Sequence, residues 1–588
     1  MNDFSDIPPL PLADWDVLIS GTGIKQSLLA VALCRAGKTV LQLDKNSYYG
    51  GSAAAFYSLS EVDAWVAKVN SGDEVGIKNA VVVSNAGEGA GYGSGRGYTL
   101  SLAPHLVYWH SSVLEILRRA DLTDGFSWHA VGSWWVCLTE EEVAVPAVAT
   151  GVGGVVGLAE VGVKAAKLAS AAGKKRAGWN KGRKKESVAE TTPGGGEESV
   201  GERVTQGNSE TTLRKVDNFR EVPCTFEDVA WSKDLTDKDR GQLGEFLRFV
   251  MRYNDPTDQK CSRIFEENRQ TSLRTFLSEI FPIPPFITTS ISSLTLIPSA
   301  PSEITLEQAL PRLAVHFSSL GKIPDVRSSA ALTIAYGGSA ELCQVLSRAA
   351  AIAGGINVLS RGVKSLCSNK KGDGNRKLKA QLESGETIYA DWAIGEASDL
   401  AKEVKPLDGK SMSRGIYVIE TQIGWLFERK YKDENITPAA AVVVVPGGDK
   451  GAPVYIIARS GVTGECPRSQ CEFSNLKSIV MSLIKPGLLH AVTESSYGDM
   501  NAAIDKVLQV CSPLSEILYS LQYTAVTTSP EIGSEDGTVI LDPLTQDIAL
   551  QDDVLEETLR IYERIVGTRE GFMDVPEEIR RMKEEMEE

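Results

Sequence analysis

A pair of glycines between an apolar strand and an apolar helix constrains the fold of this chain more than any other feature. Residues 15–20, WDVLIS, are apolar and favour a strand, and glycines follow at positions 21 and 23. Residues 24–36 carry apolar side chains at helical spacing, and residues 39–43, TVLQL, form a second apolar run. A strand, a helix and a strand within about thirty residues predict two parallel strands joined by a crossover helix.

The glycine turn matches the dinucleotide-binding fingerprint only in part. Gly21 and Gly23 suit a tight turn and a close approach of the backbone to a pyrophosphate. The third position of the fingerprint requires a small residue, and here it holds Gln26. Asp44 follows the second strand, where a ribose-binding acid would lie. The pattern favours this type of fold and leaves cofactor binding open, because the side chain of Gln26 can occupy the space of the pyrophosphate.

Composition excludes several classes of function. The 588 residues carry 77 acidic and 61 basic side chains, a formal net charge of −16, which argues against nucleic acid as a partner because phosphate binding requires a basic surface. Nine scattered cysteines and five histidines without metal-ligand spacing predict no metal site. The sequence shows no signal pattern and no apolar run of about 20 residues, so we expect a cytosolic chain.

The pattern along the chain predicts a discontinuous α/β domain, interrupted by an insertion and by a mainly helical second domain. The insertion is rich in Gly, Ala and Lys, and we expect it to be disordered. The predicted segments are 12–145 and 329–567 for the α/β domain, 150–212 for the basic insertion, 215–328 for the helical domain and 568–588 for an acidic helical tail.

The loop after the second strand contains two adjacent tyrosines, Tyr48 and Tyr49, followed by two glycines. An aromatic ring with a hydroxyl group on a loop suits a contact with another protein. Ordinary packing inside the domain is the alternative interpretation.

A second polar motif lies on a predicted helix that follows Tyr336. Glu341, Gln344 and Arg348 are spaced three and four residues apart, so they share one face of that helix. This face is either simply solvated, or it presents an acceptor, an amide and a cation to a protein partner.

In combination, these motifs resemble the Rab escort protein and Rab GDP-dissociation inhibitor family, in a fungal-type form. The matching residues are Gly21-Thr22-Gly23, Asp44, Tyr48-Tyr49-Gly50-Gly51, Tyr336-Gly337, Glu341, Gln344, Arg348 and Gly354-Gly355. The turn before the glutamate is one residue longer than the family pattern. The resemblance implies a flavoprotein-like domain that has lost flavin, and a helical domain. It also implies binding of GDP-bound Rab GTPases through Tyr48, Tyr49, Glu341, Gln344 and Arg348.

Chain length and the predicted insertion favour the escort branch of this family. The resemblance then implies a non-catalytic accessory component of the Rab geranylgeranyl transferase α/β heterodimer. Such a protein presents the C-terminal cysteines of unprenylated Rab, shields the geranylgeranyl group and delivers prenylated Rab to membranes, with transient membrane association. Residues 228–240 resemble the transferase-contact region of the family, where Trp231 and Arg240 lie nearest to its Phe and Arg.

Two alternatives stay open at this point. The nearer one is a Rab GDP-dissociation inhibitor that extracts and recycles prenylated Rab. The second is an FAD-dependent amine oxidase-like enzyme, which would require a small residue at position 26 and a glycine-rich flavin segment that residues 530–550 do not resemble. We therefore expect no catalytic residues, no bound cofactor and no metal.

Overall fold

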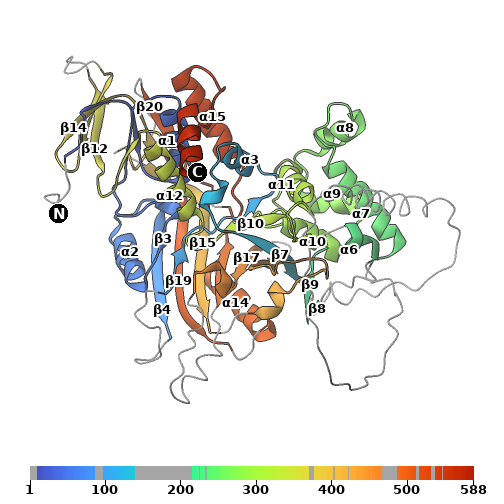
Figure 1. Ribbon diagram of the computed structural model, residues 1–588. Coiled ribbons are helices and arrows are strands. Elements are labelled where there is room, and N and C mark those ends of the chain that lie inside the picture. The colour runs from blue at the N-terminus through green and yellow to red at the C-terminus, as the bar shows by residue number, and fades with distance from the viewer. Residues whose placement is uncertain are drawn as a thin grey trace, which may run out of the picture.

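The structure, a computed structural model, describes most of the chain. The described residues are 9–85, 97–138, 215–216, 218–223, 226–231, 235–369, 376–400, 404–420, 423–448, 451–466, 487–511, 515–530, 537–545 and 547–587. Within them, a smaller and a larger β-sheet form the body of the molecule, and a group of helices gathers at the side remote from the smaller sheet (Figure 1).

The smaller sheet contains the predicted strand–helix–strand unit. Its strands follow the order β11 (Ile356–Val358), β2 (Val40–Leu43), β1 (Asp14–Ser20), β14 (Thr387–Glu396), β13 (Leu378–Leu382) and β12 (Val363–Ser368), with β20 (Thr538–Leu541) beside β14. β1 is parallel to both β2 and β14, and α1 (Ile24–Arg35) connects β1 to β2. The predicted parallel pair is confirmed, and it places the glycine turn at the carboxyl edge of the sheet.

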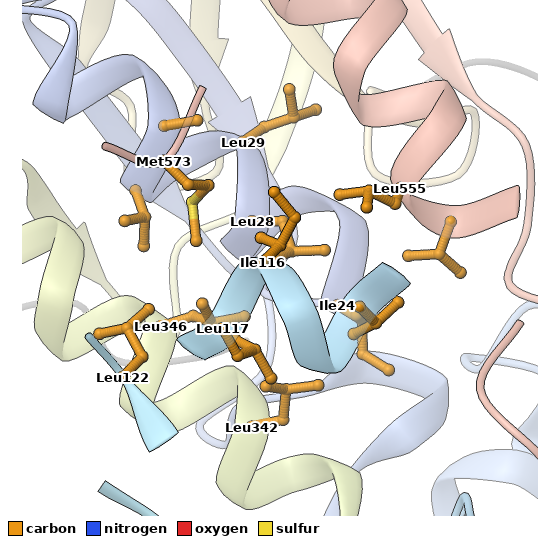
Figure 2. Close-up of a cluster of buried hydrophobic side chains, with 14 of the residues drawn as sticks. Ile24, Leu28, Leu29, Ile116, Leu117, Leu122, Leu342, Leu346, Leu555 and Met573 are labelled. Atoms are coloured by element: carbon orange, nitrogen blue, oxygen red, sulfur yellow. The ribbon is translucent and has the colours of Figure 1, made fainter. Parts of the chain in front are cut away.

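Helix α1 lies in the centre of the α/β part. All of its residues from Ile24 to Cys34 are buried, as expected for a helix covered on every side. Leu28 and Leu29 of α1 belong to an apolar core that also takes side chains from α3 (Ser112–Arg119), α12 (Ser339–Ile352) and α15 (Asp553–Val566) (Figure 2). Segments from both halves of the chain therefore complete one core.

The larger sheet is mixed and mostly antiparallel. Its path is β4 (Ile77–Ser84), β19 (Ile517–Pro530), β15 (Val404–Ile419), β18 (Gly487–Thr493), β17 (Gly451–Arg459), β16 (Ala440–Gly447), β7 (Trp128–Cys137), β10 (Ala331–Ile334) and β6 (Val107–Tyr108). β9 (Phe219–Glu221) pairs with β7, and β8 (Lys215–Val216) pairs with β9. Helix α2 (Leu59–Ser71) packs against β4, and α14 (Tyr497–Cys511) packs against β15 and β18. This sheet therefore brings together strands from the first, middle and last parts of the chain.

The helical group packs on one end of the larger sheet. Its helices are α6 (Phe226–Trp231), α7 (Asp237–Val250), α8 (Gln259–Asn268), α9 (Leu273–Glu279), α10 (Pro285–Leu294) and α11 (Leu306–Ser319). Capping boxes at Thr236 and Thr305 begin α7 and α11, because each side chain satisfies a backbone N–H of the first turn. The rings of Phe249, Phe276 and Phe281 pack within one core that continues to Trp134 of β7.

The predicted fold class, a flavoprotein-like α/β arrangement with a mainly helical second part, is confirmed. The basic insertion at residues 150–212 lies outside the described residues, and the domain boundaries stay predictions. Helix α16 (Glu577–Glu587) lies in the predicted acidic tail. Among the described helices, none has the length and apolarity that crossing a membrane requires.

Candidate functional site

The glycine turn at the edge of the smaller sheet is filled by its own helix. A β-carbon placed on Gly23 would lie 2.7 Å from Oε1 of Gln26, and one placed on Gly21 would lie 3.0 Å from its Nε2. The amide group of Gln26 therefore lies over both glycines. This is the position in which a dinucleotide fingerprint holds a pyrophosphate.

Asp44, the predicted ribose-binding acid, is engaged by its own loop. Its carboxylate accepts hydrogen bonds from the backbone N–H and the hydroxyl of Thr22, at 2.9 and 2.6 Å, and from the backbone N–H of Asn46 at 2.8 Å. Burial raises the pKa of Asp44, while these hydrogen bonds act in the opposite direction. The side chain thus holds the glycine turn to the loop that carries Tyr48 and Tyr49.

The cavity beside this turn does not fit a dinucleotide. Its volume is 70 Å³, whereas small-molecule sites usually measure about 300–1,000 Å³. Asp44, Glu74, Glu396 and Asp399 line it, and those of the four that are ionised would repel a pyrophosphate. Burial, followed by the charge of Asp399, raises the pKa of Glu396 to about 8. Lys45 lies 3.4 Å from Asp399 as a counter-charge. In the part of the chain that the structure describes, no metal-binding cluster is found either.

The two predicted tyrosines point to different parts of the interior. The hydroxyl of Tyr48 donates a hydrogen bond to Glu74 at 3.0 Å, and its ring lies edge-on to Phe56 at 5.4 Å. Tyr49 is half-buried against the apolar core that contains α1. No described hydrogen bond links either tyrosine to Glu341, so the structure does not join them to the α12 motif in one polar cluster.

A different tyrosine joins the α12 motif. Tyr57 lies between β3 (Ala55–Phe56) and α2, and its hydroxyl donates to Oε1 of Glu341 at 2.9 Å. The same hydroxyl accepts a hydrogen bond from Nε2 of Gln344 at 2.7 Å. Burial and the charge of Glu341 raise the pKa of Tyr57. We call these three residues the polar cluster. Tyr57 is 41% exposed, so the cluster faces solvent.

Arg348 extends the polar cluster along the same helix. It lies one turn after Gln344, and its side chain is exposed. No described residue forms a hydrogen bond or an ion pair with it, and none donates to the second carboxylate oxygen of Glu341. Glu341, Gln344 and Arg348 lie on one face of the helix, as predicted. The free carboxylate oxygen of Glu341 and the guanidinium group of Arg348 are therefore available to a partner.

The turn before α12 is shaped to let the polar cluster form. A β-carbon on Gly337 would lie 3.1 Å both from the hydroxyl of Tyr57 and from Oε1 of Glu341, so a larger residue would crowd their hydrogen bond. Tyr336 has a φ of +59°, a left-handed conformation that costs an L-residue roughly 1–2 kcal/mol. Tyr336 is nevertheless 51% exposed.

The predicted transferase-contact residues lie at the start of the helical group. Trp231 is the last residue of α6. Arg240 donates to the backbone carbonyl of Val229 at 3.3 Å and pairs with Asp237 at 2.6 Å, so it holds α6 to the beginning of α7. Its guanidinium group therefore has a structural role in addition to any contact with a partner.

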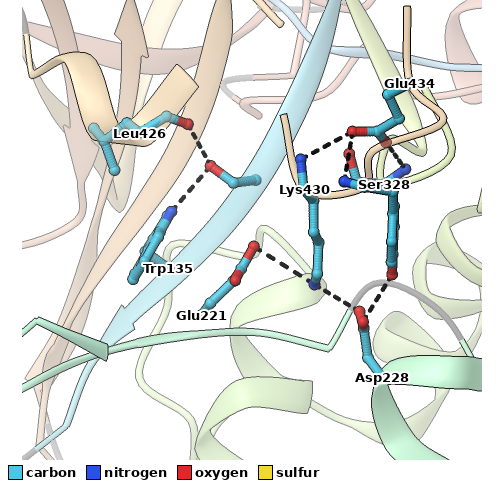
Figure 3. A network of polar contacts seen from close by, with 9 residues as sticks. Trp135, Glu221, Asp228, Ser328, Leu426, Lys430 and Glu434 are labelled. Atoms are coloured by element: carbon cyan, nitrogen blue, oxygen red, sulfur yellow. Dashed lines mark hydrogen bonds and ion pairs between the residues drawn. The ribbon is translucent and has the colours of Figure 1, made fainter. Parts of the chain in front are cut away.

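Buried charges attach α6 to the larger sheet. Asp228 of α6 accepts hydrogen bonds from Lys430 at 2.6 Å and from the hydroxyl of Tyr431 at 2.7 Å (Figure 3). Lys430 also lies 3.5 Å from Glu221 of β9, and Glu434 accepts from the backbone N–H of Ser328. This network determines where α6 lies relative to the rest of the molecule.

The glycine turn lies in a part of the chain that is similar to a known protein family. Residues 12–152 match the family model described as GDP dissociation inhibitor. Over this region, the chain is similar to the GDP dissociation inhibitor family. The matched region contains Gly21, Gln26, Asp44 and both predicted tyrosines. It also contains Tyr57 of the polar cluster, whereas α12 lies beyond it.

Curated relatives of two kinds are similar to parts of this chain. Rab proteins geranylgeranyltransferase component A of Saccharomyces cerevisiae is 38% identical over 105 residues, which cover 18% of this chain and 17% of that protein. Guanosine nucleotide diphosphate dissociation inhibitor 1 of Arabidopsis thaliana is 28% identical over 134 residues, which cover 23% of this chain and 26% of that protein. The alignments therefore span only a minor part of the length of either relative.

The fold is shared over nearly the whole chain. Rab GDI from Plasmodium falciparum superimposes with a TM-score of 0.58 at 15% identity, covering 94% of this chain and 98% of that one. At this identity the likeness concerns the fold alone. It extends from the region that matches the family model to α12 and to the helical group.

Sequence reasoning missed Tyr57. It lies six residues after the paired glycines and 284 residues before Glu341. No local periodicity links positions so far apart. An exposed aromatic residue immediately before the cap of α2 was the only local signal, and it does not reveal which helix the ring meets.

Proposed function

We propose that this chain is a Rab escort protein, the non-catalytic accessory component of Rab geranylgeranyl transferase. It would bind unprenylated, GDP-bound Rab, present the C-terminal cysteines of that Rab to the α/β heterodimer and deliver the prenylated product to membranes. We expect it in the cytosol, with transient membrane association. The family model that matches residues 12–152 and the names of the curated relatives support this proposal.

The observation that carries the proposal is the combination of a filled nucleotide turn with an exposed polar cluster. Gln26 and the adjacent carboxylates leave no room for a flavin, so this edge of the sheet is not suited to redox chemistry. The cluster of Tyr57, Glu341 and Gln344 is ordered by its own hydrogen bonds and faces solvent. Preorganised polar groups of this kind favour protein recognition, since little side-chain entropy is lost on binding.

In the proposed complex, α12 contacts the globular part of Rab through Glu341, Gln344 and Arg348. Tyr57 holds the first two in position, and Tyr48 and Tyr49 support the adjoining loop. Trp231 and Arg240 of the helical group would contact the transferase. This chain would make no bond itself, and its function would be to position one protein against another.

The decisive experiment measures prenylation of Rab. Purified transferase heterodimer, GDP-loaded Rab and labelled geranylgeranyl diphosphate are incubated with and without this chain. We expect incorporation of label only with the chain present, and a strong reduction for the double variant Glu341→Ala/Arg348→Ala. The double variant Lys364→Ala/Glu383→Ala, at the outer edge of the smaller sheet, is the matched control for surface charge. Equal incorporation with and without the chain would refute the escort proposal.

A Rab GDP-dissociation inhibitor is the second candidate, favoured by the similarity to the Arabidopsis thaliana relative. Such a protein would extract prenylated Rab from vesicles and would not support prenylation. Running the extraction assay beside the prenylation assay separates the two functions. The amine oxidase alternative has weaker support, because the residues at the glycine turn do not fit a flavin.

A further inference from the structure

Exposed apolar side chains adjoin the polar cluster on one side. Tyr336 is 51% exposed, and Val462, in the loop after β17, is 59% exposed. Tyr336 is followed by Gly337, which lies against the hydroxyl of Tyr57. The backbone N–H of Tyr336 donates to the carbonyl of Thr463 at 3.0 Å. Val462 precedes Thr463 in the chain, so Tyr336 and Val462 lie on adjoining segments beside the polar cluster, and we call these two exposed residues the apolar rim.

The ring of Tyr336 lies directly on a glycine. A β-carbon on Gly464 would come within 2.4 Å of the ring, and Gly464 has a φ of +77°, which favours glycine for a second reason. Tyr336 itself keeps a left-handed backbone. Tyr336 thus combines an unfavourable backbone conformation with a large aromatic side chain exposed to water. Backbone strain of this kind is often found at binding sites.

A buried ion pair supports the loop beneath the rim. Arg459 and Glu465 are both fully buried, and their charged groups lie 2.7 Å apart. Arg459 also donates to the carbonyl of Ile334, just before Tyr336, and the carbonyl of Glu465 accepts from the backbone N–H of Thr99. Because these contacts join β10, β17 and the segment before β5 (Leu100–Ser101), the rim is held rigidly beside the polar cluster.

The surface beyond the rim is open. A hollow of 620 Å³ begins at Val462 and is lined by Phe427 and Pro438. Arg429 and Glu428 also line it, so it is not a closed apolar pocket of the kind that encloses a lipid chain. The hollow is open, partly charged and close to an ordered polar cluster. These properties suit contact with a protein surface.

We propose that Tyr336 and Val462 extend the Rab-binding site and receive an apolar side chain of the folded GTPase surface. This inference rests on the proposed function. The charges beside the rim predict which charged side chains lie on either side of the apolar side chain of the partner. A basic side chain would face the unoccupied oxygen of Glu341, and an acidic one would face Arg348 further along the helix. An aromatic anchor bordered by paired charges is the usual composition of an interaction hot spot.

The test measures the affinity of the full chain for GDP-loaded Rab in a fluorescence titration. The rim variants are Val462→Ser and Tyr336→Asn; asparagine is chosen because it tolerates a left-handed backbone. Leu12→Ser, an exposed apolar residue near the smaller sheet, is the matched control, and the thermal midpoint of each variant reports on folding. We expect each rim variant to weaken binding about tenfold, and the control to bind like the wild type.

A further variant tests the geometry of the rim. Gly464→Ala should displace the ring of Tyr336 and weaken binding, and combining it with Tyr336→Asn should add little. Wild-type affinity in folded rim variants, together with weakened binding of Glu341→Ala, would overturn the rim and leave the proposed function standing. Failure of the wild-type chain to bind any Rab would overturn both.

Discussion

At the scale of single residues, glycines and one tyrosine determine what the candidate site can do. Gly21 and Gly23 leave space that Gln26 fills, and Gly337 leaves space for the hydroxyl of Tyr57. At both turns the absence of a β-carbon leaves space for a neighbouring side chain. Gln26 fills this space at the first turn and blocks a nucleotide, and Tyr57 uses it at the second turn to form the polar cluster. Function at this site depends on which neighbouring side chain enters the space.

Tyr57 provides the sharpest residue-scale prediction. Tyr57→Phe removes the hydroxyl group that bonds Glu341 and Gln344, so their side chains lose a common orientation. We expect Rab affinity to fall about five- to tenfold, and the free energy of unfolding to change by about 1 kcal/mol or less, because the group is partly exposed. Binding titration and urea unfolding measure the two quantities. Tyr253→Phe, in the helical group, is the control, and equal effects of both variants on binding would contradict the assigned role.

At the scale of elements, α6 depends on charges from outside its own segment. The helix has six residues, too few to be stable alone, and it carries Trp231 of the predicted transferase contact. Asp228 fastens it to Lys430 and Tyr431 in the interior. The position of the predicted contact residue is therefore set by the segment between β15 and β16, and not by the helical group alone.

Asp228→Asn tests this attachment. The side chains of Asp228 and Lys430 are 0% and 6% exposed, so the variant leaves a buried cation short of its carboxylate partner. Breaking a buried pair costs about 3–5 kcal/mol, and we expect a loss near the lower end because Glu221 still faces Lys430. Urea unfolding followed by tryptophan fluorescence measures the change.

Asp433→Asn is the matched control for Asp228→Asn. Asp433 pairs with Arg327 at the surface, where the two side chains are 60% and 40% exposed. Exposed pairs contribute at most about 1 kcal/mol. A loss from Asp228→Asn no greater than that of this control would show that the network does not hold α6 in place.

At the scale of the whole molecule, two halves of the chain complete shared cores and shared sheets. The core around α1 combines residues from both ends, and the larger sheet aligns β4 with β19 across more than 400 residues. Such long-range pairing makes the glycine turn, the polar cluster and the apolar rim parts of one cooperative structure. A change in ionisation at the turn should therefore be visible in the stability of the whole α/β part.

Stability is predicted to fall as the pH rises from about 5 to 8, the window between the ordinary pKa of a glutamate and the raised one of Glu396. In this window the folded chain holds a proton that the unfolded chain has released. Unfolding therefore releases a proton, and raising the pH favours it. Chemical unfolding at pH 6, 7 and 8 measures the slope, and Glu396→Gln should reduce it. An unchanged slope in that variant would assign the pH dependence to the general negative charge of the chain.

The sequence by itself determined the strand–helix–strand unit, the class of fold and the shared helix face of Glu341, Gln344 and Arg348. These features follow from local spacing, since apolar periodicity and glycine positions act within a few residues. It also showed that Gln26 was able to obstruct the glycine turn. Whether the side chain lies across both glycines depends on rotamer choice in a packed environment.

Only the tertiary structure decided which residues meet. It joined Tyr57 to α12, turned Tyr48 and Tyr49 towards different cores, and brought the segment around Thr463 against Tyr336. The contacts of Tyr57 with Glu341 and of Tyr336 with Thr463 connect residues more than a hundred positions apart. They depend on the strand order of the sheets, which local sequence patterns do not reveal. The sequence gives the chemistry of each side chain. The packing of the two sheets around α1 determines which side chains lie together at the surface.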